Sequence, residues 1–380
     1  MFFIAFFVLG LACSIVSIKT LIGYGELKRF SKIIISFLIV WGWMAPLIVG
    51  LLEYCSGLSP VAFKFLSISS YALMGFVFVV FCLLLLRDII WYSIYGVAKL
   101  LRVDNWSVNP KNLSMLKYAN RIVIGVSLLI CIYAFYQGGK IPDFNTIVVE
   151  SSLLKKDIRI VQLSDLHIDR TTSINRIKKI VEKVNSVSPD VIVMTGDITD
   201  DSPIYLDTQL AELMNLKAPY GVFISIGNHE FYNGLSAWLH KYHELGFKVL
   251  FNKGETVDNN VFISGIPDVH TANSEFGANI NFKQALEGSH TEQYRILLSH
   301  NPEMADSVTG INYQMILSGH THGGQIFPFH YFVKKANKYL SGDYNVNGIK
   351  LHVSSGAGTW GPSMRLFAPS EIAIIDLLKK

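Results

Sequence analysis

Five apolar runs in the second half of the chain each lead into a short polar motif that contains aspartate, asparagine or histidine. Their lengths and β-branched residues are typical of buried strands. The runs are Ile158–Leu163, Val191–Thr195, Val222–Ile226, Tyr294–Leu298 and Gln314–Leu317. The motifs after them are Asp165-Leu166-His167, Gly196-Asp197, Gly227-Asn228-His229-Glu230, Ser299-His300 and Gly319-His320-Thr321-His322. Because open α/β folds carry their chemistry at the carboxyl ends of strands, we expect one sheet to gather these side chains at one edge.

Helical patterns alternate with the first three runs. The clearest is Ser173–Ser186, where Ser173 is a suitable N-cap and isoleucine and valine recur with helical spacing. Two more helical stretches follow the second and third runs, and short strand-like runs occupy much of the remaining chain. Alternation early and strands late predict an α/β fold in which helices lie outside two packed sheets.

The polar motifs offer carboxylate, imidazole and amide ligands but no thiolate, since all four cysteines precede Tyr136. Any one motif occurs by chance in many chains, whereas the complete series, each member at a strand end, indicates a metal site. Such a ligand set suits Mn, Fe or Zn, and the lack of cysteine argues against a structural zinc site. Two such ions about 3.5–4 Å apart can hold the attacking and the leaving oxygen of a phosphoryl displacement. The sequence therefore indicates a two-metal hydrolase.

The motif series resembles that of the calcineurin-like metallophosphoesterase superfamily over roughly Ile158 to Leu377. The intact run Gly319–Gln325 is similar to that of the superfamily's membrane-anchored bacterial phosphodiesterase branch. The resemblance implies a four-layer α-β-β-α sandwich and two divalent metal ions. It implies that one ion is held by Asp165, His167, Asp197 and His322. It also implies a second ion, bridged to the first by Asp197 and a hydroxide, with the ligands Asp197, Asn228, His300 and His320.

The same resemblance assigns two catalytic residues. His229 would face the phosphate without binding a metal and would assist the leaving group. Asp200 would orient the ring of His229, a role that a carboxylate beside a histidine can fill. The loop Ser354–Thr359, followed by Arg365, resembles the family's closing loop. Other histidines without a partner pattern are expected to be structural, namely His270, His290 and His352.

The first part of the chain differs in character, because it holds four long apolar runs that lack a polar face. They are Phe2–Val16, Ile33–Leu52, Ile68–Leu86 and Ile122–Tyr136. A bilayer is spanned by about 20 apolar residues, with roughly 17 as the lower limit, which the second and third runs meet directly and the others meet with their flanks. We expect about four transmembrane helices within residues 1–137, a linker and a first strand over 138–156, and the catalytic domain over 157–380.

Basic residues predict the orientation of these runs. Four lie between the first and second runs, six between the third and fourth, and one between the second and third. Because loops rich in lysine and arginine stay in the cytoplasm, we expect a multi-pass protein of the cell membrane with an extracytoplasmic catalytic domain. A transporter normally has a charged residue within the membrane. None lies in the middle of these runs, so they are interpreted as an anchor.

Together these features predict a membrane-anchored phosphoesterase that hydrolyses phosphate esters by metal-activated hydroxide, with phosphodiesters of lipid or lipid-linked headgroups favoured. An extracytoplasmic nucleotide hydrolase is an alternative, as is a UDP-diacylglucosamine-type pyrophosphatase, which the orientation disfavours. A non-catalytic membrane receptor is least favoured because the ligand set is complete. No basic stripe with interleaved aromatics indicates nucleic acid, and no protein partner is identifiable.

The segment after Gln325 has a composition of its own. Because it leaves the motif with His320 and His322, it must begin at the edge of the metal site. Aromatic rings beside lysines suit a membrane interface; alternatively, the rings fill the domain's own core and the lysines are merely solvated. The residues concerned are Phe327, Phe329, Tyr331, Phe332, Lys334, Lys335 and Lys338.

Overall fold

The computed structural model describes residues 2–23, 27–53, 58–103, 109, 112–258, 260–269, 279–308 and 310–380. The chain divides into two compact units. The amino-terminal unit comprises Met1–Tyr136 and Gly361–Met364, and the carboxy-terminal unit comprises Gln137–Trp360 and Arg365–Lys380.

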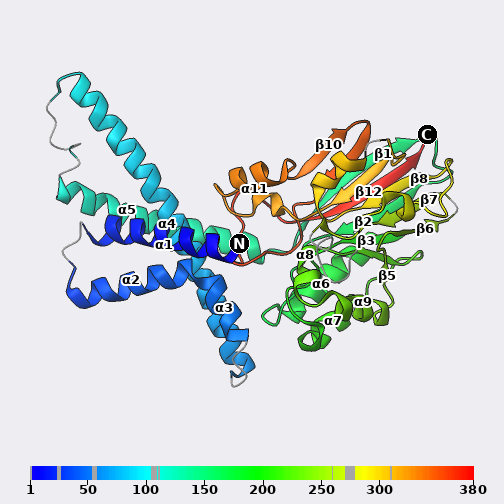
Figure 1. Cartoon of the computed structure of the whole chain (residues 1–380), viewed down its shortest axis with the longest axis horizontal. Coiled ribbons are helices and arrows are strands. Elements are labelled where there is room, and N and C mark those ends of the chain that lie inside the picture. Colours follow the sequence, from blue (N-terminus) through cyan, green and yellow to red (C-terminus); the bar gives the residue numbers. More distant parts are fainter. Residues whose placement is uncertain are drawn as a thin grey trace. The chain divides into compact units, whose positions relative to one another are not determined.

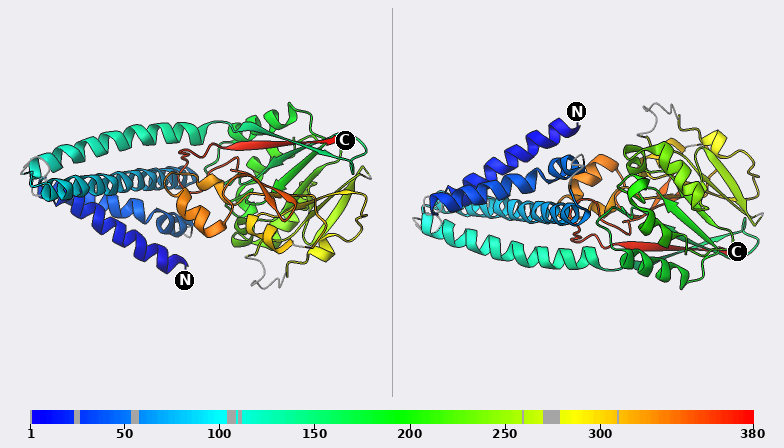
Figure 2. Two further views of the ribbon diagram at one scale, coloured as in Figure 1. Left: turned by 90° about the horizontal axis from the view of Figure 1, so that it is seen from above. Right: turned by 90° about the horizontal axis from the view of Figure 1, so that it is seen from below.

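Helices form the described part of the amino-terminal unit (Figure 1). They are α1 (Phe2–Ile22), α2 (Arg29–Trp43), α3 (Ala45–Glu53), α4 (Pro60–Leu100) and α5 (Leu113–Gly139). A small apolar cluster that includes Cys13, Trp43 and Val77 packs α1, α2 and α4 together. A second cluster joins α4 to α5, the two long helices that Figure 2 shows from both sides.

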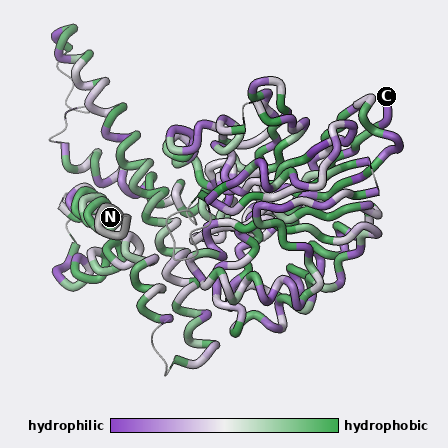
Figure 3. Tube along the Cα trace, turned by 45° about the vertical axis from the view of Figure 1, so that its right-hand side comes forward, coloured by the Kyte–Doolittle hydropathy of each residue, from purple (hydrophilic) through white to green (hydrophobic). Residues whose placement is uncertain are grey.

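Two of these helices are long and apolar enough to cross a bilayer, α4 with 41 residues and α5 with 27. The pair α2 and α3, bent by 71°, is a third candidate if the two form one span, and the apolar stretch Phe7–Ile22 of α1 is shorter. The described residues thus contain two or three candidate spans where the sequence predicts four. Figure 3 shows hydrophobic residues over much of these helices, and large side chains such as Phe65 and Leu129 are exposed. Exposed apolar area of this kind marks a surface that another apolar phase covers.

Helix α4 continues well beyond the predicted apolar run, which ends at Leu86. At about 1.5 Å per residue it is about 60 Å long, twice the hydrocarbon thickness of a bilayer. Arg87 and Lys99 therefore lie on a helix, where the run boundary predicted a loop. Arg87 bonds to Asp88 and to Asn120 of α5, so its charge is compensated within the unit.

The carboxy-terminal unit contains two six-stranded sheets. The first has the strand order β1-β12-β2-β3-β4-β5 and the second the order β10-β11-β9-β8-β7-β6. The first sheet consists of β1 (Asp143–Ser151), β12 (Glu371–Lys379), β2 (Ile158–Leu163), β3 (Val191–Thr195), β4 (Val222–Ser225) and β5 (Lys248–Val249). The second consists of β10 (Gly342–Val346), β11 (Ile349–Val353), β9 (Met315–Ser318), β8 (Tyr294–Leu298), β7 (Val261–Gly265) and β6 (Lys253–Val257).

The expectation that one sheet carries all five motif-bearing strands is wrong. Strands β2, β3 and β4 run parallel in the first sheet, while β8 and β9 run parallel in the second. An apolar run shows that a strand is buried on both faces, but it does not reveal which sheet the strand joins. One core cluster contains side chains of both sheets, including Ile160, Val193, Ile296 and Leu317, so the sheets pack face to face.

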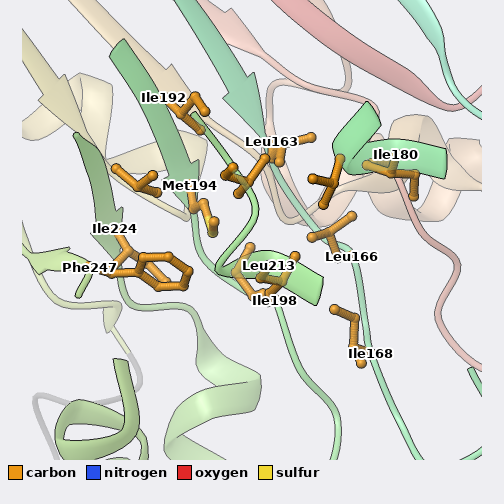
Figure 4. Close-up of a cluster of buried hydrophobic side chains, with 14 of the residues drawn as sticks. Leu163, Leu166, Ile168, Ile180, Ile192, Met194, Ile198, Leu213, Ile224 and Phe247 are labelled. Atoms are coloured by element: carbon orange, nitrogen blue, oxygen red, sulfur yellow. The ribbon is translucent and has the colours of Figure 1, made fainter. Parts of the chain in front are cut away.

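A second core cluster covers the other face of the first sheet. Helix α6 contributes Ile177, Ile180, Val181 and Val184, which recur at helical spacing and are all buried. Figure 4 shows Ile180 with strand residues such as Met194 in this cluster. The helices of the unit are α6 (Ile174–Asn185), α7 (Asp207–Leu213), α8 (Asn228–Tyr232), α9 (Leu235–Glu244), α10 (Phe282–Ala285) and α11 (His330–Asn337), with 3-10 turns η2 (Pro203–Tyr205), η4 (Pro302–Val308) and η5 (His322–Gly324).

Candidate metal centre

The nine residues predicted for the site follow five strands that lie in two sheets. The structure brings them together, because the carboxyl ends of these strands face the same region of the unit. In chain order they are Asp165 and His167 after β2, Asp197 and Asp200 after β3, Asn228 and His229 in α8 after β4, His300 after β8, and His320 and His322 after β9.

Asp197 lies at the centre of this group. Its Oδ2 atom is 3.1 Å from Nε2 of His300 and 3.9 Å from Nε2 of both His167 and His229. Ligand atoms within 4.8 Å of one another form three sets that could hold a cation, and Asp197 belongs to two of them. The sets are Asp165 with His167 and His322, Asp197 with His300 and His320, and His167 with Asp197 and His229.

The rings of His167 and His300 each use Nδ1 in a hydrogen bond that points away from the centre of the site. The lone pair of Nε2 is then directed toward that centre. Nδ1 of His300 lies 2.7 Å from the carbonyl oxygen of Thr195, which can only accept, so Nδ1 carries the proton and Nε2 is available as a ligand. Nδ1 of His167 likewise faces the carboxylate of Asp200 at 2.5 Å. Its Nε2 then lies 2.8 Å from Nε2 of His322. Two ring nitrogens at this separation need a proton or a cation between them.

Asn228 gives a second test of whether the site fits a cation. Its Oδ1 atom is buried and has no hydrogen-bond partner among the described residues. A buried carbonyl oxygen without a donor costs about 1–3 kcal/mol, which coordination to a cation would offset. The combination of carboxylate, imidazole and amide oxygen with inward lone pairs fits divalent metal ions.

The backbone at the site is unusual. Five of the predicted ligands have positive φ angles between 47° and 75°. Residues other than glycine adopt this left-handed conformation at a cost of about 1–3 kcal/mol each, and such residues cluster at functional sites. The five are Asp165, His167, Asp197, His320 and His322.

Glycines of the motifs permit close approach of neighbouring chains. A Cβ atom on Gly227 would lie 2.2 Å from Oδ1 of Asp197, and one on Gly319 would lie 2.0 Å from Oγ of Ser164. Any side chain at either position would displace a ligand-bearing loop. The glycines therefore set the distance between the strand ends.

Glu230 is a supporting residue that the sequence reasoning missed. It is fully buried, and its carboxylate accepts hydrogen bonds from the backbone nitrogens of Asp197, Ile198 and Gly227. The hydroxyl of Tyr242 is its fourth donor. Glu230 thus fixes the loop that carries Asp197 against the loop that carries Asn228. Its place in the third motif is a sequence signal, but its partners become visible only in the fold.

Arg365 stabilises the closing loop beside the site. Its buried guanidinium donates to carbonyl oxygens of Ser355, Gly356, Gly358 and Ala368, and it also donates to the carbonyl oxygen of His322. Burial lowers its pKa to about 10. Its donors are committed to the closing loop, so Arg365 holds the shape of the loop.

The pKa values of two site histidines shift in opposite directions. Burial opposes protonation of His229, but the adjacent carboxylate of Asp200, 2.7 Å away, outweighs it and raises the pKa to about 10. Burial and the neighbouring His167 hold the pKa of His322 well below its usual range. Burial also opposes protonation of His167 and His300, but the carboxylates of Asp200 and Asp197 raise the pKa values of these two histidines as well. The direction of the shift therefore does not by itself separate the predicted ligands from the proton donor.

Other histidines lie apart from this centre. His352 is buried on β11, where it contacts Asp343 at 2.8 Å and Glu371 at 3.3 Å. Its neighbours are structural strands, which agrees with the role expected for it. His270 lies outside the described residues.

Comparisons with known proteins agree with this site. A model of the calcineurin-like phosphoesterase family matches residues 158–324. An uncharacterized metallophosphoesterase of Campylobacter jejuni is 36% identical over 267 residues, which are 68% of this chain and 71% of that protein. One of Helicobacter pylori is 33% identical over 292 residues, 76% of this chain and 78% of that protein. A Danio rerio protein named transmembrane protein with metallophosphoesterase domain is 29% identical over 266 residues, which are 66% of this chain and 61% of that protein.

This protein is a metal-dependent phosphoester hydrolase by class. The mixed α/β sheets, the clustered carboxylate and imidazole side chains and the relatives all agree on that class. Within that class, the chain belongs to the calcineurin-like metallophosphoesterase family. The family and the enzyme class predicted from the motif series are thereby confirmed.

Proposed function

We propose that this chain is a membrane-anchored, two-metal phosphoesterase that hydrolyses phosphodiesters of lipid or lipid-linked headgroups. The observation that carries the proposal is the position of Oδ2 of Asp197, 3.9 Å from Nε2 of His167 and 3.1 Å from Nε2 of His300. One carboxylate between two clusters of imidazoles is the arrangement that two adjacent cations require.

In this proposal each cation has four protein ligands. Two divalent ions, Mn, Fe or Zn, would supply a nucleophile at neutral pH and stabilise the charge of the transferring phosphate. The lone pairs on His167 and His300 and the unpartnered oxygen of Asn228 support the assignment. One set is Asp165, His167, Asp197 and His322. The other set is Asp197, Asn228, His300 and His320.

His229 is proposed as the proton donor to the leaving oxygen. Asp200 holds Nδ1 of its ring at 2.7 Å, which leaves Nε2 directed toward Asp197. The carboxylate of Asp200, 2.7 Å from Nδ1, favours the protonated ring, which a proton donor requires. Asp200 also contacts Nδ1 of His167 at 2.5 Å, so one carboxylate orients a ligand and the proton donor together.

The proposed architecture is an anchor of about four helices over residues 1–137, a linker and first strand over 138–156, and a four-layer α-β-β-α domain over 157–380. Apolar helices and relatives named as transmembrane proteins support the anchor. The distribution of basic residues supports an extracytoplasmic domain in a multi-pass protein.

The test is hydrolysis by the purified full-length chain reconstituted with each metal. The substrates are soluble phosphodiesters, phosphomonoesters, nucleotides, a UDP-linked diacylglucosamine and lipid phosphodiesters in vesicles, and Asp197→Asn is the inactive reference. We expect metal-dependent cleavage of phosphodiesters, with lipid phosphodiesters preferred. Activity confined to soluble nucleotides would favour the nucleotide hydrolase, activity confined to the UDP-linked lipid would favour the pyrophosphatase, and no hydrolysis with any metal would overturn the proposal.

A further inference from the structure

Exposed aromatic side chains in the carboxy-terminal unit gather in two places, the stretch 327–332 and the pair Trp360 and Phe367. Six of the eight exposed aromatics in the described part of this unit lie there, with exposed fractions between 40% and 79%, and the other two are Tyr205 and Tyr232. We name the six the aromatic rim. They are Phe327, Phe329, Tyr331, Phe332, Trp360 and Phe367.

Contacts between the two places make the rim a single surface. The rings of Phe327 and Phe367 lie 5.7 Å apart between centroids, and those of Phe327 and Tyr331 lie 6.2 Å apart. The side chain of Gln325 donates to the carbonyl oxygen of Trp360 and accepts from its backbone nitrogen. The two places are thus fixed to each other by Gln325, which belongs to the last metal-site motif.

The rim reaches the proposed active site through Trp360. Its ring centroid is 6.4 Å from that of His229, the proposed proton donor. A substrate whose phosphate lies at His229 would therefore have its remaining part beside exposed aromatic rings.

Helix α11, orange in Figure 1, carries part of the rim and has no buried residue. A helix of eight residues is marginal in water unless it packs against something. Lys334 and Lys335 in its last turn are exposed and form no ion pair with another described residue. Lys338, by contrast, is bonded to Asp306 at 2.8 and 2.9 Å. Of the three lysines that the sequence groups with these aromatic residues, Lys338 is thus paired with a carboxylate.

We propose that the aromatic rim and the lysines Lys334 and Lys335 dock on an anionic lipid bilayer and guide lipid phosphoesters into the metal centre. This inference deepens the proposed function and rests on it. Rings of Trp and Tyr favour the headgroup level of a bilayer, and Phe side chains on an amphipathic surface bury at the boundary between headgroups and acyl chains. Lys334 and Lys335 beside them gain favourable interactions with anionic lipids.

Chain connectivity favours a bilayer over a second protein as the occupant. Only Lys140–Pro142 separate α5, a candidate span, from β1. Three extended residues reach about 10 Å, so the chain can run only a short way between the end of a candidate span and the first residue of β1. A protein partner would need acidic groups opposite the two lysines, whereas an anionic leaflet supplies them over its whole surface.

Docking is tested with a fluorophore that reports its surroundings. It is attached at Tyr331→Cys in the full-length chain, with the four native cysteines replaced, and the protein is placed in nanodiscs of phosphatidylcholine with or without phosphatidylglycerol. We expect a blue shift that depends on phosphatidylglycerol, is lost in Lys334→Gln/Lys335→Gln and persists in the matched control Lys338→Gln. The same label at Ile204→Cys, an exposed position outside the rim, should not shift.

Activity gives an independent readout. The p-nitrophenyl ester of phosphatidic acid in anionic vesicles is compared with soluble bis-p-nitrophenyl phosphate, which releases the same product. We expect the ratio of the two kcat/KM values to fall at least tenfold in Lys334→Gln/Lys335→Gln, since two lysines at an anionic surface are worth about thirtyfold in binding. An identical Tyr331→Cys spectrum in both lipids would overturn the inference even if the enzyme is active. A normal shift without any hydrolysis would count instead against the proposed function.

Discussion

The backbone around Asp197 is held from several directions, which gives this side chain little freedom. Its own nitrogen donates to Glu230, its Oδ1 accepts from the backbone nitrogen of His229, and its Oδ2 faces three imidazoles. These contacts come from three other motifs, those that contain His167, the pair His229 and Glu230, and His300. A substitution at Asp197 should therefore weaken the binding of both proposed cations, whereas a substitution at His229 should remove the proton donor and leave both cations bound.

The first prediction separates these two roles. His229→Ala should lower kcat by about 10²–10⁴-fold, the usual contribution of a general acid, while the protein retains both metals. Asp197→Asn should lose bound metal as well as activity. Metal content by mass spectrometry and turnover on a phosphodiester with a poor leaving group provide the measurement. Loss of one metal in His229→Ala would make this histidine a ligand, as its membership of one candidate set allows.

For single residues, the sequence indicates which side chains could bind a metal, but it does not indicate which residues hold those side chains in place. Aspartate and histidine in short motifs at strand ends are visible as residue types. The support from Glu230 depends on Tyr242 and on backbone nitrogens of another motif, and the support from Arg365 consists of bonds to carbonyl oxygens. Every residue has a backbone nitrogen and a carbonyl oxygen, so the residue types alone do not show which of these groups a side chain will bond.

Among the elements, strands β10, β11 and β12 share one charge cluster around the buried side chain of His352. His352 on β11 contacts Asp343 on β10 and Glu371 at the start of β12. The carboxylate of Glu371 also accepts from the backbone nitrogen of Ser355 in the closing loop. The cluster therefore joins the second sheet to the first near the metal centre.

The second prediction concerns the pH dependence of stability. Burial opposes protonation of His352, but the hydrogen bond to Asp343 and the carboxylate of Glu371, 3.3 Å from Nε2, outweigh it and raise its pKa. The folded state then holds a proton that the unfolded state releases near pH 6.5, so the stabilisation is complete below about 6.5 and is lost as pH rises through the folded pKa. His352→Gln should cost about 1–2 kcal/mol at pH 6, less than a fully buried pair because Asp343 is half exposed.

Thermal unfolding of the metal-free full-length chain at pH 6 and pH 9 provides the measurement. The loss of Tm caused by His352→Gln should be larger at pH 6. His240→Gln is the matched control, since His240 is exposed and pairs only with Glu244, and it should change Tm little at either pH. An equal loss for His352→Gln at both values would show that packing alone accounts for the effect.

Element types were more predictable than their pairing. The runs Ile158–Leu163, Val191–Thr195 and Tyr294–Leu298 form β2, β3 and β8 with the expected bounds, because length and β-branching are local properties. Partition of the strands between two sheets depends on contacts far apart in the chain, which no local pattern encodes. For the same reason α4 extends through charged residues where hydropathy alone indicated an end.

For the whole molecule, the third prediction is the orientation of the two units across the membrane. Protease added to intact spheroplasts should cleave the chain after Pro142, and the segment from Arg87 to Arg121 should be protected. The reason is the six basic residues in that segment, which favour the cytoplasm. Antibodies against each segment identify the fragments. A catalytic unit that is cleaved only after lysis would invert the orientation and place its substrate in the cytoplasmic leaflet.

The strand order of the first sheet has a consequence for biosynthesis. Strand β12 lies between β1 and β2, and Arg159 on β2 pairs with Asp376 on β12, 217 positions later in the chain. Because translation is vectorial, β1 and β2 are made long before the strand that joins them, and pairing at such separation is slow. The nascent unit therefore stays open until nearly all of it has been synthesised.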